Sequence, residues 1–428
     1  MSRTAAARST GQRQLGIGIA LLGILLIGAN LRASLTAVGP LIGDVQRDLG
    51  FSSMLASALV GLPLICFAVF SPVAPRVASR FGLERTLGAA LLILAAGIVL
   101  RSVPWLPLLW LGTVLLGLAI ALANVLLPPL LKRDFPLDAG RYTGAYSAVQ
   151  SVFAALAAGV AVPVAGWTEA TWRLSLGMWA GLALIAFAVF SPRLRGSTSV
   201  KALREPVSAG GPAGAAGAAG VARSAAAGGA AGDRGGEDRW SPWRSPTAWM
   251  ITVAMGTQST LYYVVITWWP EIEQAQGISA NAAGVHLSVL QLCGILGNLT
   301  TAAVLQRWQR DQRGLIAVLV PLNVTGLAGM LLLPSWALLW SMLIGMALGS
   351  WIVFCLASFS LRTRNHRHAA SLSGMAQSFG YLLAALGPFA LGALHDVTGS
   401  WTPPLVVLLC LQLVQLVSAY GASRPRLA

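Results

Sequence analysis

The most constraining feature of this sequence is a succession of apolar runs, each long enough to cross a membrane. About 20 residues of helix span the hydrocarbon core of a bilayer. Only 10% of the 428 residues are charged, against about 25% in soluble domains, which excludes a water-soluble enzyme of this size. We therefore expect an all-α polytopic membrane protein. Its twelve transmembrane helices are predicted at 15–43, 52–77, 83–102, 105–131, 141–166, 171–192, 246–271, 279–305, 313–333, 335–361, 369–395 and 401–421.

The basic residues indicate which loops face the cytoplasm. The net charge of +15 would suit a nucleic-acid partner, but these residues form short clusters between apolar runs and no continuous stripe, so none is expected. With the N-terminus inside, almost all Lys and Arg fall on the inner side, and Arg47, Arg101 and Arg173 fall outside. This asymmetry predicts a multi-pass protein of the inner membrane, embedded in the lipid bilayer, with both termini cytoplasmic.

A segment rich in Gly and Ala divides the chain into two halves. Residues 196–245 bury too little apolar surface to form a core, so we expect a cytoplasmic linker between six-helix bundles at 1–195 and 246–428. The halves match weakly at an offset of 230 residues, as in Pro40 with Pro270 and Gly144 with Gly374. Two pseudo-symmetric bundles of this kind place a substrate path at their interface.

One charged side chain, Arg32, lies deep inside a predicted span. An arginine at the bilayer centre costs about 2.5–3.5 kcal/mol on insertion scales. All 14 acidic residues fall in loops or near predicted span ends, so no carboxylate is expected at the depth of Arg32. We therefore predict that Arg32 binds a small anionic or strongly polar solute. The alternative is a structural arginine that donates to backbone carbonyls.

Polar side chains in other spans complete the predicted site. Tyr262 occupies the position equivalent to Arg32 and forms an i, i+4 pair with Gln258. Tyr263 follows it, and because neighbours on a helix point about 100° apart, only one of the two tyrosines is expected to face a cavity. The further candidates are Asn30, Asn124, Tyr146, Gln150, His286, Gln377 and Tyr381. Hydrogen bonding between packed helices is the alternative role for these side chains.

His286 is the only well-embedded side chain that the sequence indicates would titrate near neutral pH. A single histidine on an apolar helix is more often a packing residue, and no carboxylate partner is expected for it within the membrane. The four cysteines and four histidines show no metal-ligand spacing, so neither a metal nor a cofactor is expected.

Several motifs resemble those of a known family. They are Asn30-Leu31-Arg32 with Val38-Gly39-Pro40; Asn124-Val125-Leu126-Leu127-Pro128 with Lys132-Arg133-Asp134-Phe135-Pro136; and Tyr263, Thr267, Trp268 and Pro270. In these residues the chain resembles the major facilitator superfamily and, within it, the cyanate and nitroimidazole porter family. The resemblance implies cyanate-like anions or nitroimidazole-like solutes, and it favours Tyr263 over Tyr262. Pro75 and Ser79 depart from the superfamily motif G-x-x-x-D-R-x-G after the second span.

Together these features predict a secondary active transporter, not an enzyme, that works by alternating access around Arg32. The sequence contains no G-x-x-x-x-G-K-[ST] motif, so ATP is not expected to be the direct energy source. A monomer is expected because one chain supplies both bundles. A polytopic membrane enzyme and a solute sensor that does not transport are the alternatives.

Overall fold

The computed structural model describes residues 2–71, 73–135, 139–167, 171–196, 241–307, 311–363 and 366–424, and within these ranges every regular element is a helix. The N-terminal half consists of α1 (Ser2–Thr36), η1 (Gly39–Leu41), α2 (Ile42–Leu49), α3 (Ser53–Phe70), α4 (Ala74–Phe81), α5 (Leu83–Ser102), α6 (Leu106–Asp134), α7 (Ala139–Ala165), α8 (Thr171–Gly177), α9 (Trp179–Phe190) and η2 (Ser191–Gly196).

The C-terminal half repeats the arrangement with fewer interruptions. It consists of η3 (Pro242–Arg244), α11 (Pro246–Ala275), α12 (Ala280–Arg307), α13 (Arg313–Leu332), η4 (Pro334–Trp336), α14 (Ala337–Leu361), α15 (His366–Thr398) and α16 (Thr402–Ser423). Most of the predicted linker lies outside the described residues, and its described end contains η3 and the cap of α11.

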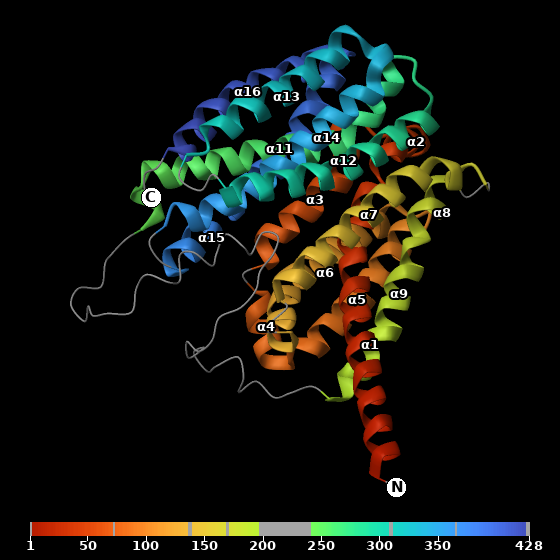
Figure 1. Cartoon of the computed structure of the whole chain (residues 1–428). Coiled ribbons are helices and arrows are strands. Elements are labelled where there is room, and N and C mark those ends of the chain that lie inside the picture. The colour runs from red at the N-terminus through yellow and green to blue at the C-terminus, as the bar shows by residue number, and fades with distance from the viewer. Residues whose placement is uncertain are drawn as a thin grey trace.

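The two halves form two bundles that lie side by side (Figure 1). The helices of the N-terminal half (red to yellow) and of the C-terminal half (green to blue) meet mainly where α3 packs on α15 and α7 packs on α12. We use 'termini end' for the end of the molecule where α1 begins and α16 ends. The end that carries α2 and α8 is called the opposite end. The bundles diverge towards the termini end in Figure 1.

The expected membrane spans are present. Among the described residues, eleven helical segments are long and apolar enough to cross a bilayer. The twelfth span is α11, which has 30 residues but carries many hydroxyl and amide side chains in its middle. The all-α fold with two six-helix halves is therefore confirmed, and its least apolar span is one that faces the other half.

Several predicted boundaries were wrong because a helix breaks within an apolar run. The first predicted span is divided at residues 37–41, where Pro40 occupies the first turn of η1. Proline lacks an N–H group and cannot continue the hydrogen-bond ladder of a preceding helix. The second span ends at Phe70 and a separate amphipathic helix, α4, follows it. Hydropathy alone does not reveal such breaks because the broken segments stay apolar.

Gly39 brings the break in the first span against the C-terminal half. A Cβ atom at this position would lie 2.1 Å from the carbonyl oxygen of Ile266 on α11. Only glycine permits two backbones to approach so closely. The break therefore packs directly on α11 of the other half.

Candidate substrate-binding site

Arg32 and Tyr262 meet at the interface between the two halves. The Nη1 atom of Arg32, on α1, donates a hydrogen bond of 2.9 Å to the hydroxyl of Tyr262, on α11. The guanidinium carbon also lies 4.9 Å from the centre of the Tyr262 ring, within the range of a cation–π interaction. These two residues are 230 positions apart, which is the offset that relates the halves. Because symmetry-equivalent positions touch only near the symmetry axis, this contact lies close to the pseudo-twofold axis.

The hydroxyl of Tyr262 is an acceptor for a second helix of its own half. The Nε2 atom of Gln291, on α12, donates to it at 3.2 Å. A phenol oxygen has two lone pairs and one hydrogen to donate. Arg32 and Gln291 use both lone pairs, which leaves the Tyr262 hydrogen for an acceptor such as a bound solute.

The charge of Arg32 is surrounded by phenol groups and not by acids. The titratable side chains that lie near the guanidinium are Tyr262, Tyr263 and Tyr381. None of the ion pairs formed within the described ranges includes Arg32. The guanidinium therefore has hydrogen-bonding capacity at the interface and no fixed counter-charge.

Tyr263 and Tyr381 form the wall next to Arg32. The Tyr263 ring packs edge-to-face on Tyr262, with centroids 5.1 Å apart, and Tyr381 packs edge-on to Phe67 of α3 at 6.2 Å. The sequence left open which of Tyr262 and Tyr263 lies nearer the site. Tyr262 makes the direct contact with Arg32, while Tyr263 is buried beside it.

Three other predicted site residues make hydrogen bonds within their own half. Asn30 is buried and donates to the carbonyls of Leu26 and Leu182 at 2.8 and 3.4 Å, which joins α1 to α9. Gln377 donates to Ser373 on its own helix at 2.7 Å. Gln258 is buried, and its carbonyl accepts from Ser259 at 3.3 Å. Of these bonds, that from Asn30 to Leu182 joins two packed helices, as in the alternative role, while those of Gln377 and Gln258 lie within a single helix.

Three further predicted residues lie on α6 and α7. Asn124 is exposed on α6, although an amide is unfavourable against lipid. Tyr146 is half-buried and packs against Gly28 of α1, where an added Cβ would lie 3.2 Å from the Tyr146 Cβ. Gln150 is half-buried one turn further along α7. A contact between these residues and Arg32 is not part of the described geometry, so their place in the site stays a prediction.

His286 has a carboxylate partner, so the expectation that it lacks one was wrong. Its Nδ1 atom lies 3.0 Å from Oε2 of Glu273, a side chain with no exposed surface. The predicted seventh span ended at residue 271, which placed Glu273 in a loop, whereas α11 continues to Ala275. A boundary error of a few residues therefore hid the most buried acid of the described chain.

Arg101 is a buried cation that sequence reasoning placed outside the membrane. It has no exposed surface, and its Nη2 atom donates to the carbonyl of Ser34 at 3.1 Å, near the end of α1. Its Nε and Nη1 atoms have no hydrogen-bond partner among the described residues. The position of Arg101 in the last turn of an apolar run was the available signal, because a basic residue there can turn inwards as well as outwards.

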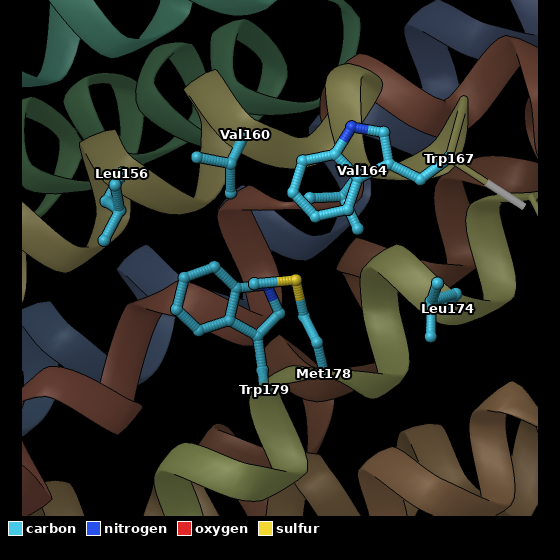
Figure 2. A pocket seen from close by; sticks show the side chains of 7 residues that line it. All are labelled: Leu156, Val160, Val164, Trp167, Leu174, Met178 and Trp179. Atoms are coloured by element: carbon cyan, nitrogen blue, oxygen red, sulfur yellow. The ribbon is translucent and has the colours of Figure 1, made fainter.

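A groove of about 420 Å³ on the surface of the N-terminal half does not contain these residues. Figure 2 shows its lining of apolar and aromatic side chains from α7, α8, α9 and the turn after α7: Leu156, Val160, Val164, Trp167, Leu174, Met178 and Trp179. A groove without a charged side chain suits hydrocarbon and not an anion. We therefore take the Arg32 region, not this groove, as the candidate site.

The fold and this buried polar contact define a polytopic membrane protein built from two six-helix halves. Residues 20–421 match the sequence profile described as Major Facilitator Superfamily. The chain belongs to the major facilitator superfamily, and it is a transporter of this class. The family resemblance that the motifs around Arg32 and Asn124 indicated is confirmed.

Three relatives cover most of the chain. A protein of Bacillus subtilis (strain 168) described as the uncharacterized transporter YycB is 38% identical over 408 residues, which are 95% of this chain and 94% of the relative. The 2-nitroimidazole transporter of Escherichia coli (strain K12) is 36% identical and covers 95% of this chain and 96% of the relative. The cyanate transport protein CynX of the same organism is 26% identical, with coverages of 89% and 91%.

Solved structures agree with the fold. A D-xylose-proton symporter matches with a TM-score of 0.67 at 15% identity and covers 94% of this chain and 96% of the symporter. A bacterial homolog of the human lysosomal transporter Spinster matches with a TM-score of 0.65 at 15% identity, with 94% of each chain covered. At this identity the likeness establishes the fold alone.

Proposed function

We propose that the protein is a secondary active transporter that moves a small anionic or strongly polar solute across the inner membrane of a bacterium. Arg32 is the central binding group, and both termini lie in the cytoplasm. The names of two relatives, which specify 2-nitroimidazole and cyanate, support a small electron-rich solute. One chain supplies both halves, so the working unit is a monomer.

The contact between Arg32 and Tyr262 carries this proposal. A guanidinium presents donors in a planar fork that matches two acceptor atoms of one ligand. The hydroxyl hydrogen of Tyr262 adds a donor from the other half. A solute that accepts from both residues would bridge the two bundles at their symmetry axis, where its binding affects how the bundles pack.

The hydrogen bonds between the halves support alternating access. Towards the opposite end, Asp396 of α15 accepts from the backbone N–H groups of Ser53 and Met54 at 2.8 and 2.9 Å. Ser288 of α12 also donates to the carbonyl of Ala155 on α7 at 2.6 Å. These bonds hold the two bundles together between Arg32 and that end.

The polar contacts at the termini end join residues of the same half. Arg133 pairs with Glu84 at 2.5 Å, and Arg193 pairs with Asp134. In the other half Arg362 donates to the carbonyl of Ser423 at 2.7 Å. Within the part of the chain that the structure describes, the bonds between halves therefore lie at the centre and beyond it. This pattern supports a conformation that is closed at the opposite end and opens towards the termini.

Ligand binding by the purified protein tests the role of Arg32. Binding to the folded state raises the melting temperature by mass action, so we expect 2-nitroimidazole or cyanate to raise that of the wild type. Arg32→Ala should abolish the shift, and Arg32→Lys should weaken it because lysine keeps the charge but loses the fork. Arg47→Ala removes an exposed arginine and serves as the matched control.

Equal shifts in the wild type and in both Arg32 variants would refute the assigned role. Flux measurements in proteoliposomes then distinguish a transporter from a sensor. A sensor would bind the solute and show the same dependence on Arg32, but it would not release solute on the other side of the membrane.

A further inference from the structure

A second buried polar cluster lies between α11, α12 and α14, away from the Arg32 contact. Oε2 of Glu273 faces Nδ1 of His286 at 3.0 Å, and Oε1 of Glu273 accepts a hydrogen bond of 3.0 Å from Ser341. The indole Nε1 of Trp269 donates to the same serine oxygen at 2.7 Å. Glu273 and Ser341 have no exposed surface. Burial strongly disfavours the charged form of a glutamate. The contacts that compensate for the burial of Glu273 therefore need an explanation.

The direction of these hydrogen bonds shows which form of Glu273 the cluster accommodates. An indole N–H can only donate, so the oxygen of Ser341 is the acceptor for Trp269. The serine hydrogen is then free to be donated to Oε1 of Glu273. When Nδ1 of His286 carries a hydrogen, it can donate to the other oxygen, so both carboxylate oxygens can accept, as in the ionised form.

The ionised carboxylate then needs a positive charge in the same place. The side chains shown to hydrogen-bond Glu273 or its serine partner are His286, Ser341 and Trp269, of which only His286 can become a cation. A protonated His286 makes the pair neutral overall, whereas loss of that proton leaves a net negative charge buried in a medium of low dielectric. The pair therefore favours holding one proton as long as the helices stay packed around it.

Charges on the neighbouring elements face another residue. The charged or titratable side chains near this end on elements that pack against α11 are Asp44, Arg47 and Asp48 of α2 and His395 and Asp396 of α15. Asp48 pairs with Arg173 of α8. Arg47, Asp396 and Asp44 act on Glu271, two positions before Glu273. His395 contacts Ser53 and Asp396. In the described chain, the α13, α14 and α16 segments near this end carry no acidic or basic side chain.

From this geometry we propose that Glu273 and His286 form a proton-binding site through which proton movement is coupled to solute transport. The inference rests on the proposed function and names its coupling ion. His286 receives the proton, because its side chain is 17% exposed while that of Glu273 is sealed. The proton is released when α11 and α12 rearrange and the pair becomes hydrated, since hydration removes the penalty for a separated charge.

The same two helices connect the proton-binding site with Arg32. Tyr262 and Glu273 lie three turns apart on one face of α11, about 16 Å along its axis. Their partners Gln291 and His286 both belong to α12. The two helices are therefore bonded to each other at both places. A solute that accepts the Tyr262 hydrogen shares this hydroxyl with Gln291. Its binding therefore changes the packing of this helix pair, and with it the stability of the protonated pair.

Proteoliposomes that hold the full-length protein test the proposal with labelled cyanate and 2-nitroimidazole as probes. Two modes are compared: accumulation driven by a pH gradient, and exchange with equal solute and equal pH on both sides, which needs no net proton movement. We expect the wild type to perform both. Glu273→Gln should keep at least half of the exchange rate but lose the response to the gradient at least tenfold, and His286→Gln should do the same. Asp44→Asn, which replaces a partly exposed acid near the same end, should behave like the wild type.

The outcomes separate the two proposals. A wild type that exchanges solute but ignores the pH gradient overturns the proton-binding site and leaves the proposed transport intact. A Glu273→Gln variant that still follows the gradient also overturns it. If Glu273→Gln does not fold, His286→Gln and the wild type decide by the same comparison. A wild type that neither binds nor exchanges either probe refutes the proposed function itself.

Discussion

The two halves place different chemistry at equivalent positions. At the symmetry axis the N-terminal half supplies the cation Arg32 and the C-terminal half supplies the neutral Tyr262. Away from the axis, the N-terminal half buries Arg101 without an acid, whereas the C-terminal half buries Glu273 with His286. In a pseudo-symmetric fold, equivalent backbone positions come together at the axis. The side chains at these positions, and therefore their charges, differ between the halves.

This difference suggests that the two bundles have different roles, one in solute binding and the other in proton binding. A cation without a fixed counter-charge attracts an anionic or electron-rich ligand. An acid paired with a histidine holds a proton instead. Under the two proposals above, the N-terminal half would supply the cation that binds the solute, and the C-terminal half would supply the groups that respond to protons. The following predictions test how far this asymmetry goes.

Exchanging the two residues at the axis should have the largest effect. Because hydrogen bonds to a charged group contribute about 1.5–3 kcal/mol, we expect Arg32→Tyr to weaken solute binding by about 10- to 100-fold. Adding Tyr262→Arg returns a guanidinium to the same contact from the other half. The double variant should recover most of that loss, as measured by ligand-induced shifts of the melting temperature.

A double variant that binds no better than Arg32→Tyr would show that the side on which the cation is anchored matters. Tyr262→Arg alone places two guanidinium groups together. We expect this single variant to lower the free energy of unfolding of the ligand-free protein. That loss is the control, because it shows that the new arginine lies next to Arg32.

The hydrogen bonds of Asp396 are another difference between the halves. At the opposite end α15 supplies a carboxylate, whereas α3 supplies only backbone N–H groups. Asp396→Ala should favour separation of the halves there by about tenfold, because two charge-assisted bonds are lost. Ser57 is buried one turn from Ser53 on α3. Ser57→Cys should become more reactive towards a membrane-impermeant maleimide when Asp396 is replaced.

The labelling experiment requires a background without the exposed native thiol, so Cys410→Ser is included in every variant. Asp44→Asn is the matched control, since Asp44 pairs with Arg47 of its own half. Unchanged reactivity of Ser57→Cys in Asp396→Ala would mean that these bonds do not hold the halves together.

Tyr262→Phe should have a smaller effect than loss of Arg32. It removes one hydroxyl and keeps the ring beneath the guanidinium. A neutral hydrogen bond contributes about 0.5–1.5 kcal/mol, so we expect binding to weaken by about three- to tenfold. Tyr263→Phe is the control and should change affinity less. A larger loss for Tyr263→Phe would make Tyr263 the residue that contacts the solute, as the family resemblance favours.

The smallest effect is expected for Arg101→Met. Arg101 has one acceptor among the described residues, and an apolar side chain of similar length avoids the burial of charge. The free energy of unfolding should change by no more than about 1 kcal/mol, measured by denaturation in detergent. Arg362→Met is the comparison in the other half. It should destabilise by about 3 kcal/mol, since Arg362 donates to the backbone of Ala422 and Ser423 and to Gln312.

Destabilisation of Arg101→Met as severe as that of Arg362→Met would contradict this assessment. It would show that Arg101 is held as firmly as Arg362, and the two halves would then be alike in their buried arginines.

The sequence by itself determined the membrane spans, the two halves and the isolation of Arg32 from acids. Hydropathy over about 20 residues and the counting of charges are local properties, and they do not depend on how helices rotate. The offset of 230 residues even placed Tyr262 opposite Arg32 before any contact was known. The tight packing of the break at Gly39 on α11 was not part of that information.

The tertiary structure alone decided which polar side chains meet. Rotation of α1 turns Asn30 to backbone carbonyls in its own half and Arg32 to the other half. A few more residues of helix carry Glu273 into contact with His286. Such pairings depend on helix rotation, tilt and exact length, because side chains one position apart on a helix point about 100° apart. No hydropathy profile contains that information, so the contact between Glu273 and His286 is visible only in the packed helices.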